Sequence, residues 1–356
     1  MRILYGLNGE GMGHAMRTVV VASHLASRGH SLEFVTSSGR AYDFISSKFP
    51  GKVHKVVGLS MSMKGNALQP LATFAKNLLA QTVASPFAHL GTALCISRPD
   101  AVISDFDPWT ARYASYGKIP LLAIDNIHFM NRCRHPAGLV AGSKGDRDAA
   151  SLMFPITAEM VPDADRYMVT TFAEAETRLP RTTLHAPILR KEILSREKTV
   201  GSHVVVYMND KGDGERLIGV LKRVSEVPFV VYAAGGSQFA GGNVSWREFS
   251  QEGFLRDFLS SRAVIGGAGF TLMTEAIYSQ KPMLALPFEG QFEQILNANY
   301  LQGCGFGERA KVISTGTVQG FLGRSDVYRE RLRGLKHDGN QELLSSVDGW
   351  LRRWES

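Results

Sequence analysis

The sequence predicts an α/β protein built from two Rossmann-like domains. In both halves of the chain, short apolar runs alternate with amphipathic stretches of helical period, which is the order of a doubly wound parallel sheet. A chain of 356 residues is long enough for two separate cores. The alternation lapses in the charged stretch 186–202, around Pro187, which indicates a linker. The predicted domains are residues 1–186 and 187–340, followed by a final helix over 341–356.

The N-terminal half contains six predicted strands, each a short apolar run of the kind that parallel sheets bury on both faces. They are Arg2–Leu7, Ser31–Thr36, Val53–Val57, Ala101–Ser104, Leu121–Asp125 and Arg166–Thr171. The helices predicted between them are Ala15–Ser27, Tyr42–Ser47, Leu68–Cys95 and Pro108–Tyr116. Residues 126–150 are polar, glycine-rich and basic, and we expect a long functional loop there.

The C-terminal half repeats this alternation without a detectable sequence repeat. Its predicted strands are His203–Met208, Phe229–Ala233, Ala263–Ile265 and Pro282–Pro287. Helices are predicted over Gly253–Leu259, Thr271–Gln280 and Asn297–Leu301. The last predicted helix, Leu343–Trp354, is amphipathic and carries Trp350 and Trp354 one turn apart, so one of its faces must be covered.

Composition narrows the class of protein. Apolar residues make up 44% of the chain and charged residues 21%, which excludes a disordered or fibrous protein. No apolar run is long enough to span a bilayer, and the apolar core at Met1–Gly6 is too short for a signal peptide, so a cytoplasmic location is predicted. The three cysteines, Cys95, Cys133 and Cys304, are too widely spaced to suggest a disulfide framework or a zinc site.

A glycine-rich turn separates the strand Ala263–Ile265 from the helix that follows it. Gly267 and Gly269 let a ligand approach the backbone closely, and Phe270 and Thr271 open the helix. The unpaired N–H groups and the positive dipole end of a helix start attract anions. This segment is therefore a predicted phosphate site.

Three polar side chains near this turn are candidate ligands for neutral hydroxyl groups. Glu275 lies one turn after Thr271, off the apolar face of its helix. It would repel a phosphate but can accept hydrogen bonds from a diol such as a ribose; the alternative is a glutamate that only favours the helix start. Glu293 and Gln294 follow the strand Pro282–Pro287, at the end where open α/β sheets bind ligands, and are suited to sugar hydroxyls.

This spaced set resembles the nucleotide-sugar signature of the GT-B glycosyltransferases. That superfamily includes the UDP-glucuronosyltransferases, the plant natural-product glycosyltransferases and the peptidoglycan GlcNAc transferase. The matching residues are Gly269, Glu275, Pro282, Pro287, Glu293, Gln294, Asn297 and Ala298. The Gly-Gln-x-Glu-Gln form is most similar to a little-characterised bacterial and archaeal branch. Gly267 stands where plant members have a phosphate-binding histidine, so phosphate contacts would rest on backbone amides and the helix end.

The resemblance implies two Rossmann-like domains facing across a cleft, with the donor bound by the C-terminal domain and the acceptor by the N-terminal one. It implies an inverting, metal-independent glycosyltransferase that uses a UDP- or dTDP-linked sugar and no cofactor. It also implies that the final helix crosses back to the N-terminal domain; the alternative is that this helix covers its own domain. Weaker donor-side candidates, at strand ends or in the loop that holds the base in relatives, are Asn209, Gly236, Phe249 and Ser250.

The loop after the first strand, Asn8–His14, differs from the dinucleotide-binding Gly-x-Gly-x-x-Gly pattern. The second strand ends in Thr36-Ser37-Ser38, without an acidic ribose ligand, which disfavours NAD or FAD. His14 is either a capping or packing histidine or a general base. Asp105 follows the strand Ala101–Ser104 at the same sheet edge, and a carboxylate against an imidazole raises its basicity.

The resemblance favours the general base, because many relatives pair a histidine after the first strand with an aspartate after the strand near residue 100. His14 and Asp105 occupy the matching positions. Asp105-Phe106-Asp107 also has the spacing of an Asp-x-Asp metal motif. That motif belongs to a different glycosyltransferase fold, and Asp107 before Pro108 is typical of a helix N-cap. No metal site is therefore predicted.

The acceptor side is expected in the N-terminal half, which carries most of the net charge of +7. Segments 38–76 and 130–147 are basic, and the first also contains methionines. This combination suits an anionic or lipid-linked acceptor, or peripheral binding to the inner face of a membrane; the alternative is a solvated basic surface. No nucleic-acid partner is predicted. The acceptor-side candidates are Gly11, Gly13, Arg132 and Arg134.

Two rival functions fit the same double-Rossmann frame. One is a sugar-nucleotide epimerase, which would need further acidic catalysts that the sequence does not reveal. The other is a non-catalytic, nucleotide-sugar-binding partner of another transferase, against which the presence of His14, Glu275, Glu293 and Gln294 counts.

Overall fold

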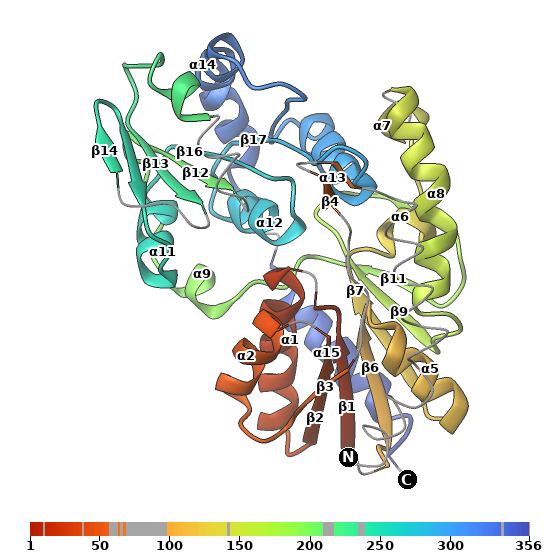
Figure 1. The fold of residues 1–356 in the computed structure, drawn as a ribbon. Coiled ribbons are helices and arrows are strands. Elements are labelled where there is room, and N and C mark those ends of the chain that lie inside the picture. The colour runs from red at the N-terminus through yellow and green to blue at the C-terminus, as the bar shows by residue number, and fades with distance from the viewer. Residues whose placement is uncertain are drawn as a thin grey trace. The chain divides into compact units, whose positions relative to one another are not determined.

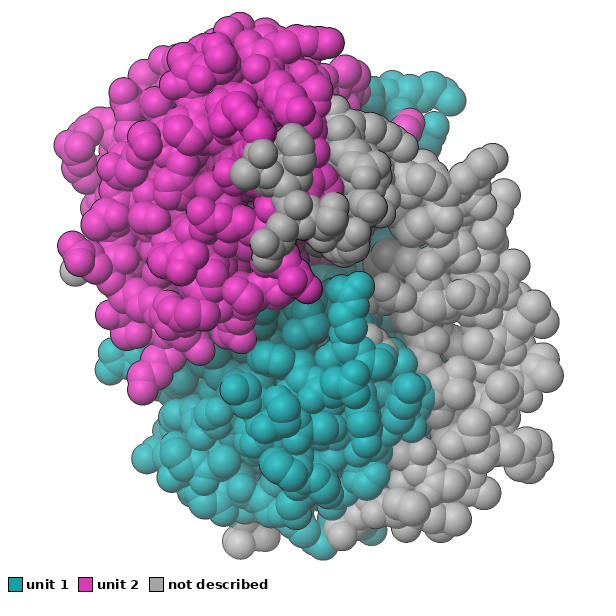
Figure 2. Space-filling model, turned by 60° about the vertical axis from the view of Figure 1, so that its left-hand side comes forward, with its two compact units in different colours: residues 1–190, 338–356 teal, residues 191–337 magenta. Residues whose placement is uncertain are grey.

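The computed structural model describes residues 1–9, 11–37, 39–56, 63–64, 67–68, 98–140, 143–208, 217–233, 239–335 and 338–355. The chain divides into two compact units, which Figure 2 shows in different colours. Unit 1 comprises Met1–Arg190 together with Asp338–Ser356, and unit 2 comprises Lys191–His337. The first division thus falls four residues after the predicted domain end at residue 186, and the second falls shortly before the final helix.

Unit 1 is built on a seven-stranded sheet with the strand order β11-β9-β7-β6-β1-β2-β3 (Figure 1). Every neighbouring pair in it runs parallel. The strands are β1 (Arg2–Leu7), β2 (Ser31–Thr36), β3 (Val53–Lys55), β6 (Ala101–Asp105), β7 (Leu121–Asp125), β9 (Arg166–Thr170) and β11 (Thr182–His185). Its helices are α1 (Met12–Ser27), α2 (Gly39–Lys48), α5 (Pro108–Gly117), α6 (Phe129–Arg132), α7 (Ala137–Val140), α8 (Lys144–Met160) and α15 (Asn340–Leu351). Two short antiparallel pairs are β4 (Met63–Lys64) with β5 (Ala67–Leu68) and β8 (Cys133–Arg134) with β10 (Glu176–Thr177).

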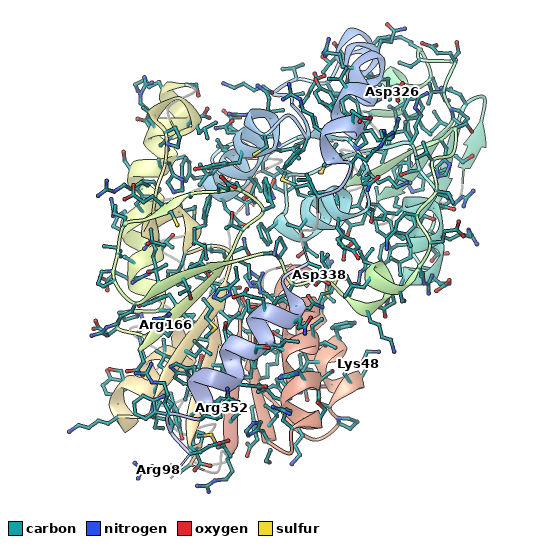
Figure 3. All side chains as sticks on the ribbon, turned by 180° about the vertical axis from the view of Figure 1, so that it is seen from behind. Lys48, Arg98, Arg166, Asp326, Asp338 and Arg352 are labelled. Carbon is teal, nitrogen blue, oxygen red and sulfur yellow. The ribbon has the colours of Figure 1, made fainter. Side chains whose placement is uncertain are left out.

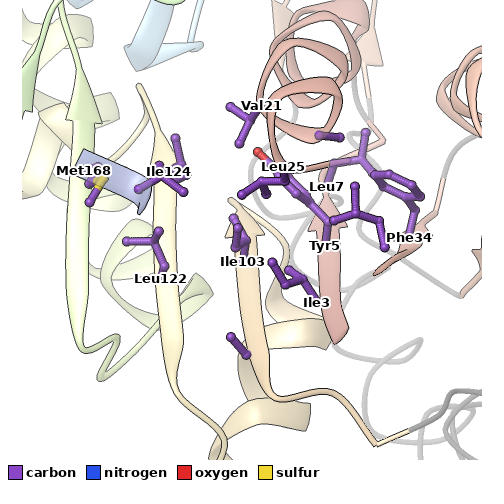
Figure 4. Packing of buried hydrophobic residues seen from close by; sticks show 14 of the residues in the cluster. Ile3, Tyr5, Leu7, Val21, Leu25, Phe34, Ile103, Leu122, Ile124 and Met168 are labelled. Atoms are coloured by element: carbon purple, nitrogen blue, oxygen red, sulfur yellow. The ribbon is translucent and has the colours of Figure 1, made fainter. Parts of the chain in front are cut away.

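The core of unit 1 lies between one face of this sheet and helices α1 and α15. Ile3, Tyr5 and Leu7 alternate along β1 and are buried together with Leu25 of α1 and Trp350 of α15. Figure 4 shows the β1 side chains and their neighbours from close by. The period of two along the strand therefore places every second residue of β1 in this core.

Helix α5 approaches the opposite face at Gly6. A Cβ atom on Gly6 would lie 2.1 Å from Oγ1 of Thr110, so only glycine allows this approach. Asp107 caps the helix, because its carboxylate accepts a hydrogen bond of 2.8 Å from the backbone N–H of Thr110, and Pro108 takes the first helical position. The predicted N-cap role of Asp107 is confirmed.

The final helix, α15, belongs to unit 1. Figure 3 shows it between the labels Asp338 and Arg352. Ring atom Nε2 of His24 in α1 lies 2.8 Å from the carboxylate of Asp348, and Nδ1 of His185 at the end of β11 lies 2.8 Å from that of Glu342. Helix α15 is thus tied to the unit that contains the N-terminus and not to the unit that precedes it in the chain.

The prediction of a long loop over residues 126–150 is wrong, because helices α6, α7 and the start of α8 occupy most of this segment. Ser143 caps α8 by accepting a hydrogen bond of 3.2 Å from the backbone N–H of Asp146. The buried face of α8 consists largely of small or polar side chains such as Ala149, Ala150 and Thr157, so its apolar period is weak. Apart from Leu68, the helix predicted over Leu68–Cys95 lies outside the described residues.

Unit 2 contains a second seven-stranded sheet, with the order β14-β15-β13-β12-β16-β17-β18. All neighbours run parallel except the edge pair β14 and β15. The strands are β12 (Val204–Met208), β13 (Phe229–Ala233), β14 (Phe239–Gly241), β15 (Val244–Arg247), β16 (Ala263–Gly266), β17 (Met283–Ala285) and β18 (Gly307–Arg309). The helices are α9 (Lys191–Ser195), α11 (Gln251–Leu259), α12 (Phe270–Tyr278), α13 (Phe292–Gly303) and α14 (Thr315–Leu332). The sequence analysis did not predict β14, β15, β18, α9 or α14.

A buried lysine ties three segments of unit 2 together. Only 1% of Lys281 is exposed, and its Nζ donates hydrogen bonds to the carbonyl oxygens of Thr199 and, at 2.7 Å, of Ser261. These residues precede β17, β12 and β16, which are neighbours in the sheet. Burial lowers the pKa of Lys281 to about 8, and the positive charge of Arg329 acts in the same direction.

This lysine predicts a pH dependence of stability. Relative to a Lys281→Met variant, the free energy of unfolding should rise between about pH 8 and pH 10.5. Below that window both the folded and the unfolded chain carry the charge, and the folded chain bears the cost of burying it. Within the window the folded chain releases the proton first, which relieves a cost on the order of 3 kcal/mol. Denaturant unfolding of both proteins across this range measures the difference, and a constant difference would contradict the prediction.

Candidate functional site

The carboxyl ends of three neighbouring strands in unit 1 bring polar residues to one edge of the sheet. Asn8 follows β1, Asp105 ends β6 and Asn126 follows β7. The backbone N–H of Asn8 donates a hydrogen bond of 3.0 Å to the carbonyl oxygen of Asp105, which fixes the two strand ends against each other. This is the edge at which parallel α/β sheets bind ligands.

His14 and Asp105 meet at this edge. Atom Nδ1 of His14 lies 2.7 Å from Oδ1 of Asp105. The Asp105 side chain is completely buried, whereas 12% of the His14 side chain is exposed. His14 sits in the first turn of α1, the helix that directly follows β1, so the start of this helix holds the imidazole at the sheet edge. The arrangement can hold a proton-accepting imidazole in a fixed orientation.

Arg17 also binds Asp105, a contact that the sequence analysis missed. Its Nε lies 2.8 Å from Oδ2 and its Nη2 lies 2.6 Å from Oδ1 of that carboxylate. Arg17 follows His14 by three residues, a spacing that puts both side chains on one face of α1. This spacing is the feature of the sequence that could have identified Arg17 as a site residue. A charged residue in a predicted amphipathic helix is, however, normally assigned to the solvent-exposed face.

The turn after Asp105 has an unusual backbone. Phe106 has φ of 56°, in the left-handed region that bulky side chains rarely adopt. Asp107, next in the chain, is buried, and that burial raises its pKa to about 6 against the opposing effect of its hydrogen bonds to Thr110. The two carboxylates of the Asp-x-Asp spacing thus have different tasks, since Asp105 binds His14 and Arg17 and Asp107 caps α5.

A second buried histidine–aspartate pair lies nearby in the chain and was also missed. Nδ1 of His128 is 2.6 Å from Oδ2 of Asp125, and each side chain is 1% exposed. The His128 ring packs edge-on against the rings of Phe106 and Tyr167. Burial alone would raise the pKa of Asp125, but the charge and hydrogen bonds of His128 lower it below its usual value.

The predicted acceptor-side residues have mixed surroundings. Gly11 precedes α1 with φ of 87°, a conformation that favours glycine, and Gly13 lies in the first turn of the helix. The guanidinium of Arg132 lies 3.4 Å from the ring centroid of Tyr167 and binds Oγ1 of Thr182 at 2.8 Å. Arg132 therefore stabilises unit 1 internally, and the structure does not bring it into contact with His14.

Arg134 is exposed and lies 3.6 Å from the carboxylate of Glu176 across the short β8–β10 pair. An exposed pair of this kind contributes little to stability, so the side chain can reorient at small cost.

In unit 2, the predicted glycine turn joins β16 to α12. A Cβ on Gly266 would lie 2.8 Å from the carbonyl oxygen of Tyr207, so a side chain does not fit there. Nδ2 of Asn297 donates a hydrogen bond of 3.2 Å to the carbonyl oxygen of Ala268, which braces the turn from α13. Gly269 then precedes α12, which opens with Phe270 and Thr271. The start of α12 thereby forms a rigid backbone frame of the kind that binds anions.

Gln294, another predicted donor-side residue, lies next to this turn in the folded unit. Oε1 of Gln294 accepts a hydrogen bond of 3.1 Å from the backbone N–H of Phe288, and a Cβ on Gly267 would lie 3.9 Å from that same oxygen. Gln294 is buried and Glu293 is half-buried, both in the first turn of α13. Gln294 therefore links the loop after β17 to the glycine turn.

Glu275 is buried, with 3% of its surface exposed. The expectation that it lies off the packed side of its helix is therefore wrong. Met273, Ala276 and Ile277 are buried and Leu272 is half-buried. The neighbouring helix α13 reaches the turn before α12 through Asn297, so a single apolar face does not describe this helix. A carboxylate at such depth needs polar partners.

Two of the weaker donor candidates are described and two are not. Phe249 is 52% exposed and forms an aromatic group with Tyr207, Tyr232 and Phe254. Ser250 caps α11, since its Oγ accepts a hydrogen bond of 3.1 Å from the N–H of Gly253. Asn209 and Gly236 lie outside the described residues.

Comparison with known proteins gives one family and many similar folds. A profile of the family described as glycosyl transferase family 1 matches residues 1–325. No curated protein matches the chain. The calicheamicin glycosyltransferase CalG4 is 18% identical with a TM-score of 0.66, over 100% of this chain and 99% of that one. UGT2 of Phytolacca americana, solved with UDP-2fluoro-glucose and pterostilbene, is 14% identical with a TM-score of 0.68, over 98% of both chains.

MurG of Acinetobacter baumannii is also similar, with 15% identity and a TM-score of 0.58 over 98% of this chain and 99% of that one. These likenesses extend over both units and confirm the predicted fold class, an α/β chain with two Rossmann-like parts.

Proposed function

This chain belongs to glycosyl transferase family 1 and is a glycosyltransferase of the GT-B superfamily, and we propose that it moves a sugar from a nucleotide-diphospho-sugar to an acceptor hydroxyl with inversion at the anomeric carbon. The observation that carries the proposal is the 2.7 Å contact between His14 and a fully buried Asp105. A general base is what the attack of a neutral hydroxyl requires.

In the proposed reaction His14 is the base. Its Nε2 takes the proton of the acceptor hydroxyl while that oxygen forms a bond to the anomeric carbon of the donor sugar. The bond from that carbon to the diphosphate oxygen breaks in the same displacement, so the sugar inverts and the nucleoside diphosphate leaves. Asp105 stabilises the imidazolium that forms on His14.

The donor would be bound by unit 2. The diphosphate would lie at the start of α12, where backbone N–H groups and the helix dipole stabilise the negative charge of the leaving group. Glu275 would accept hydrogen bonds from the ribose diol. Glu293 would accept hydrogen bonds from the sugar hydroxyls, and Gln294 could accept from them or donate to them. Phe249, exposed beside Tyr207 and Tyr232, is suited to stacking on the base.

No cofactor or metal is needed in this scheme. The positive charge that a divalent cation would supply to the diphosphate is replaced by the frame at residues 266–271. The two aspartates with the spacing of a metal motif already have other partners, which supports a scheme without a metal. Asp105 accepts a hydrogen bond from Arg17, and Asp107 accepts one from the backbone N–H of Thr110. Within the described ranges, no group of three or more His, Cys, Asp or Glu side chains is placed to hold a metal ion.

The direct test is to incubate the purified chain with a panel of nucleotide-sugars and measure the nucleoside diphosphate released, with and without candidate acceptors. A UDP-linked sugar is the first donor to try, given the ligand solved with the Phytolacca enzyme. Acceptor-dependent release supports the proposal. Conversion of the sugar without an acceptor would identify an epimerase, and donor binding without any turnover would identify a non-catalytic partner.

A membrane-bound or anionic acceptor is proposed from the charge of unit 1. Arg40, Lys48, Lys52 and Lys55, on α2, on β3 and in the turn between them, are all exposed, and Asp43 is the exposed acidic residue among them. Lys76 and the apolar residues of segment 38–76 at positions 59 and 61 lie outside the described residues. In the described part of the chain, no helix has both the length and the hydrophobicity to cross a membrane.

We expect the chain to float with anionic liposomes at low salt and to dissociate at high salt, each basic residue near the surface contributing about 1 kcal/mol. Replacing Lys48 and Lys52 by glutamate should weaken this binding, whereas the same change at the exposed Lys222 and Arg223 of unit 2 should not. Lack of binding to anionic vesicles at low salt would point to a water-soluble acceptor.

A further inference from the structure

Arg17 is a buried cation in the catalytic part of unit 1. Only 5% of its side chain is exposed, and its guanidinium contacts His14, Asp105 and Asn126. Burial alone would lower its pKa, but the charge of Asp105 and the hydrogen bonds to it raise the pKa above its usual value, so the group stays charged. A buried arginine with this set of partners is placed to control the carboxylate next to the proposed base.

The contact between Arg17 and Asp105 is bidentate. Nε binds Oδ2 at 2.8 Å and Nη2 binds Oδ1 at 2.6 Å, so the planar guanidinium holds both oxygens and the carboxylate cannot rotate. The guanidinium is itself fixed from the other side, because Nη1 donates to Oδ1 of Asn126 at 3.0 Å. Residues on α1, β6 and the segment after β7 thereby form one rigid network.

This network decides which ring nitrogen of His14 carries the proton. Nδ1 lies 2.7 Å from Oδ1 of Asp105 and 3.2 Å from Nη2 of Arg17. Arg17 can only donate, and by donating to both oxygens it keeps Asp105 as an unprotonated carboxylate. An unprotonated Nδ1 would then face the lone pairs of Oδ1 at 2.7 Å, which is repulsive. The contact with Oδ1 is the shorter of the two, so Nδ1 carries the proton and donates it to Asp105. The 3.2 Å approach of Nη2 to Nδ1 is then a contact between two donors and not a hydrogen bond, and Nε2 keeps its lone pair.

We propose that Arg17 is a positioning residue that locks the Asp105 carboxylate and, through it, the Nδ1–H tautomer and ring orientation of His14. The inference rests on the proposed role of His14 as the base, because only the Nδ1–H tautomer leaves Nε2 free to accept a proton. Asp125 is the other carboxylate whose charge acts on Arg17. Asp125 is itself hydrogen-bonded to His128. Arg17 is thus committed to Asp105.

The alternative is that Arg17 only neutralises a buried carboxylate. A lysine at this position separates the two roles, because it keeps the charge but cannot bind both oxygens in one plane. The decisive measurement is the ring ¹⁵N spectrum of His14 in the full chain labelled with ¹⁵N-histidine, with the His14→Ala variant used to assign the signals. It reports the tautomer directly and does not depend on activity.

We expect the native chain to show Nδ1–H and an unprotonated Nε2, and Arg17→Lys to show a mixture of tautomers. In the transferase assay, Arg17→Lys should lower kcat about 10- to 100-fold with little change in the KM of the donor, as the loss of an orienting partner does elsewhere. Arg28→Lys is the matched control: it lies just after α1, is exposed and pairs with Asp348, so both readouts should stay native.

An Arg17→Lys chain that keeps the Nδ1–H tautomer and native kcat would overturn the proposal. If the lysine variant does not fold, as judged by its thermal unfolding, Arg17→Gln is the second variant. It keeps one donor but removes the positive charge, so a retained Nδ1–H tautomer with native kcat overturns the proposal, and a mixture of tautomers supports it. Failure of the proposed function is a separate result: His14→Ala would retain turnover while the tautomer of His14 still depended on Arg17.

Discussion

Replacing His14 by alanine should lower kcat by about 10²- to 10⁴-fold while leaving the affinity for the donor nearly unchanged. The reason is that the imidazole is placed to take the proton of the acceptor hydroxyl, a task of the chemical step, whereas the donor would be bound by residues of unit 2. Asp105→Asn should have the smaller effect, since it removes the charge that stabilises the imidazolium but keeps the base. Initial rates with donor and acceptor at saturation measure both effects.

The control for this prediction is His24→Ala. His24 lies on the same helix as His14 and pairs with Asp348 of α15 at 2.8 Å, outside the proposed site, so its loss should act on stability. Thermal unfolding of all three variants separates the two effects. Near-native turnover of the His14 variant on its true acceptor would place the base elsewhere in the chain.

Glu275→Ala should weaken the binding of the nucleoside diphosphate by about 1.5–3 kcal/mol, which is roughly 10- to 150-fold, through the loss of charge-assisted hydrogen bonds to the ribose diol. Calorimetric titration with the nucleoside diphosphate alone measures this without any acceptor. Because Glu275 is 3% exposed, the alanine also removes a buried side chain, and some loss of stability is expected in addition.

Glu275→Gln separates the two contributions, since it keeps the shape and loses the charge. Glu330→Ala, on the exposed face of α14 in the same unit, serves as the matched control, and its affinity should remain native. Unchanged affinity in Glu275→Gln and Glu275→Ala would return this glutamate to a structural role at the start of α12.

The alternation of apolar runs and helices was enough to predict both parallel sheets, because buried parallel strands are short, apolar and separated by helices. Strands β11, β14, β15 and β18 were missed because they are three or four residues long and lie among glycines and polar residues. Helix α8 was missed because its buried face is made of small side chains. The local hydrophobic pattern therefore predicts a strand or helix only where its buried side chains are apolar and uninterrupted.

The pairing of His14 with Asp105 was predictable, but the wider network around this pair was not. His14 and Asp105 each follow a strand, which the sequence shows, and strand ends of a parallel sheet meet at one edge. Arg17 and Asn126 join them through contacts between residues more than 80 positions apart. The periodicity of a helix gives no information about such distant partners. The burial of Glu275 was missed for a similar reason, since helix periodicity does not reveal what a second helix covers.

The placement of α15 has a consequence for synthesis. Most of unit 1 is translated before unit 2, yet Leu343, Val347 and Trp350 of its core are translated after unit 2. Unit 2 is continuous, from Lys191 to His337, and has all of its residues before α15 is made. During translation the N-terminal segment of unit 1 therefore keeps part of its apolar core uncovered until α15 has been made. We expect chaperone dependence to concentrate on this segment.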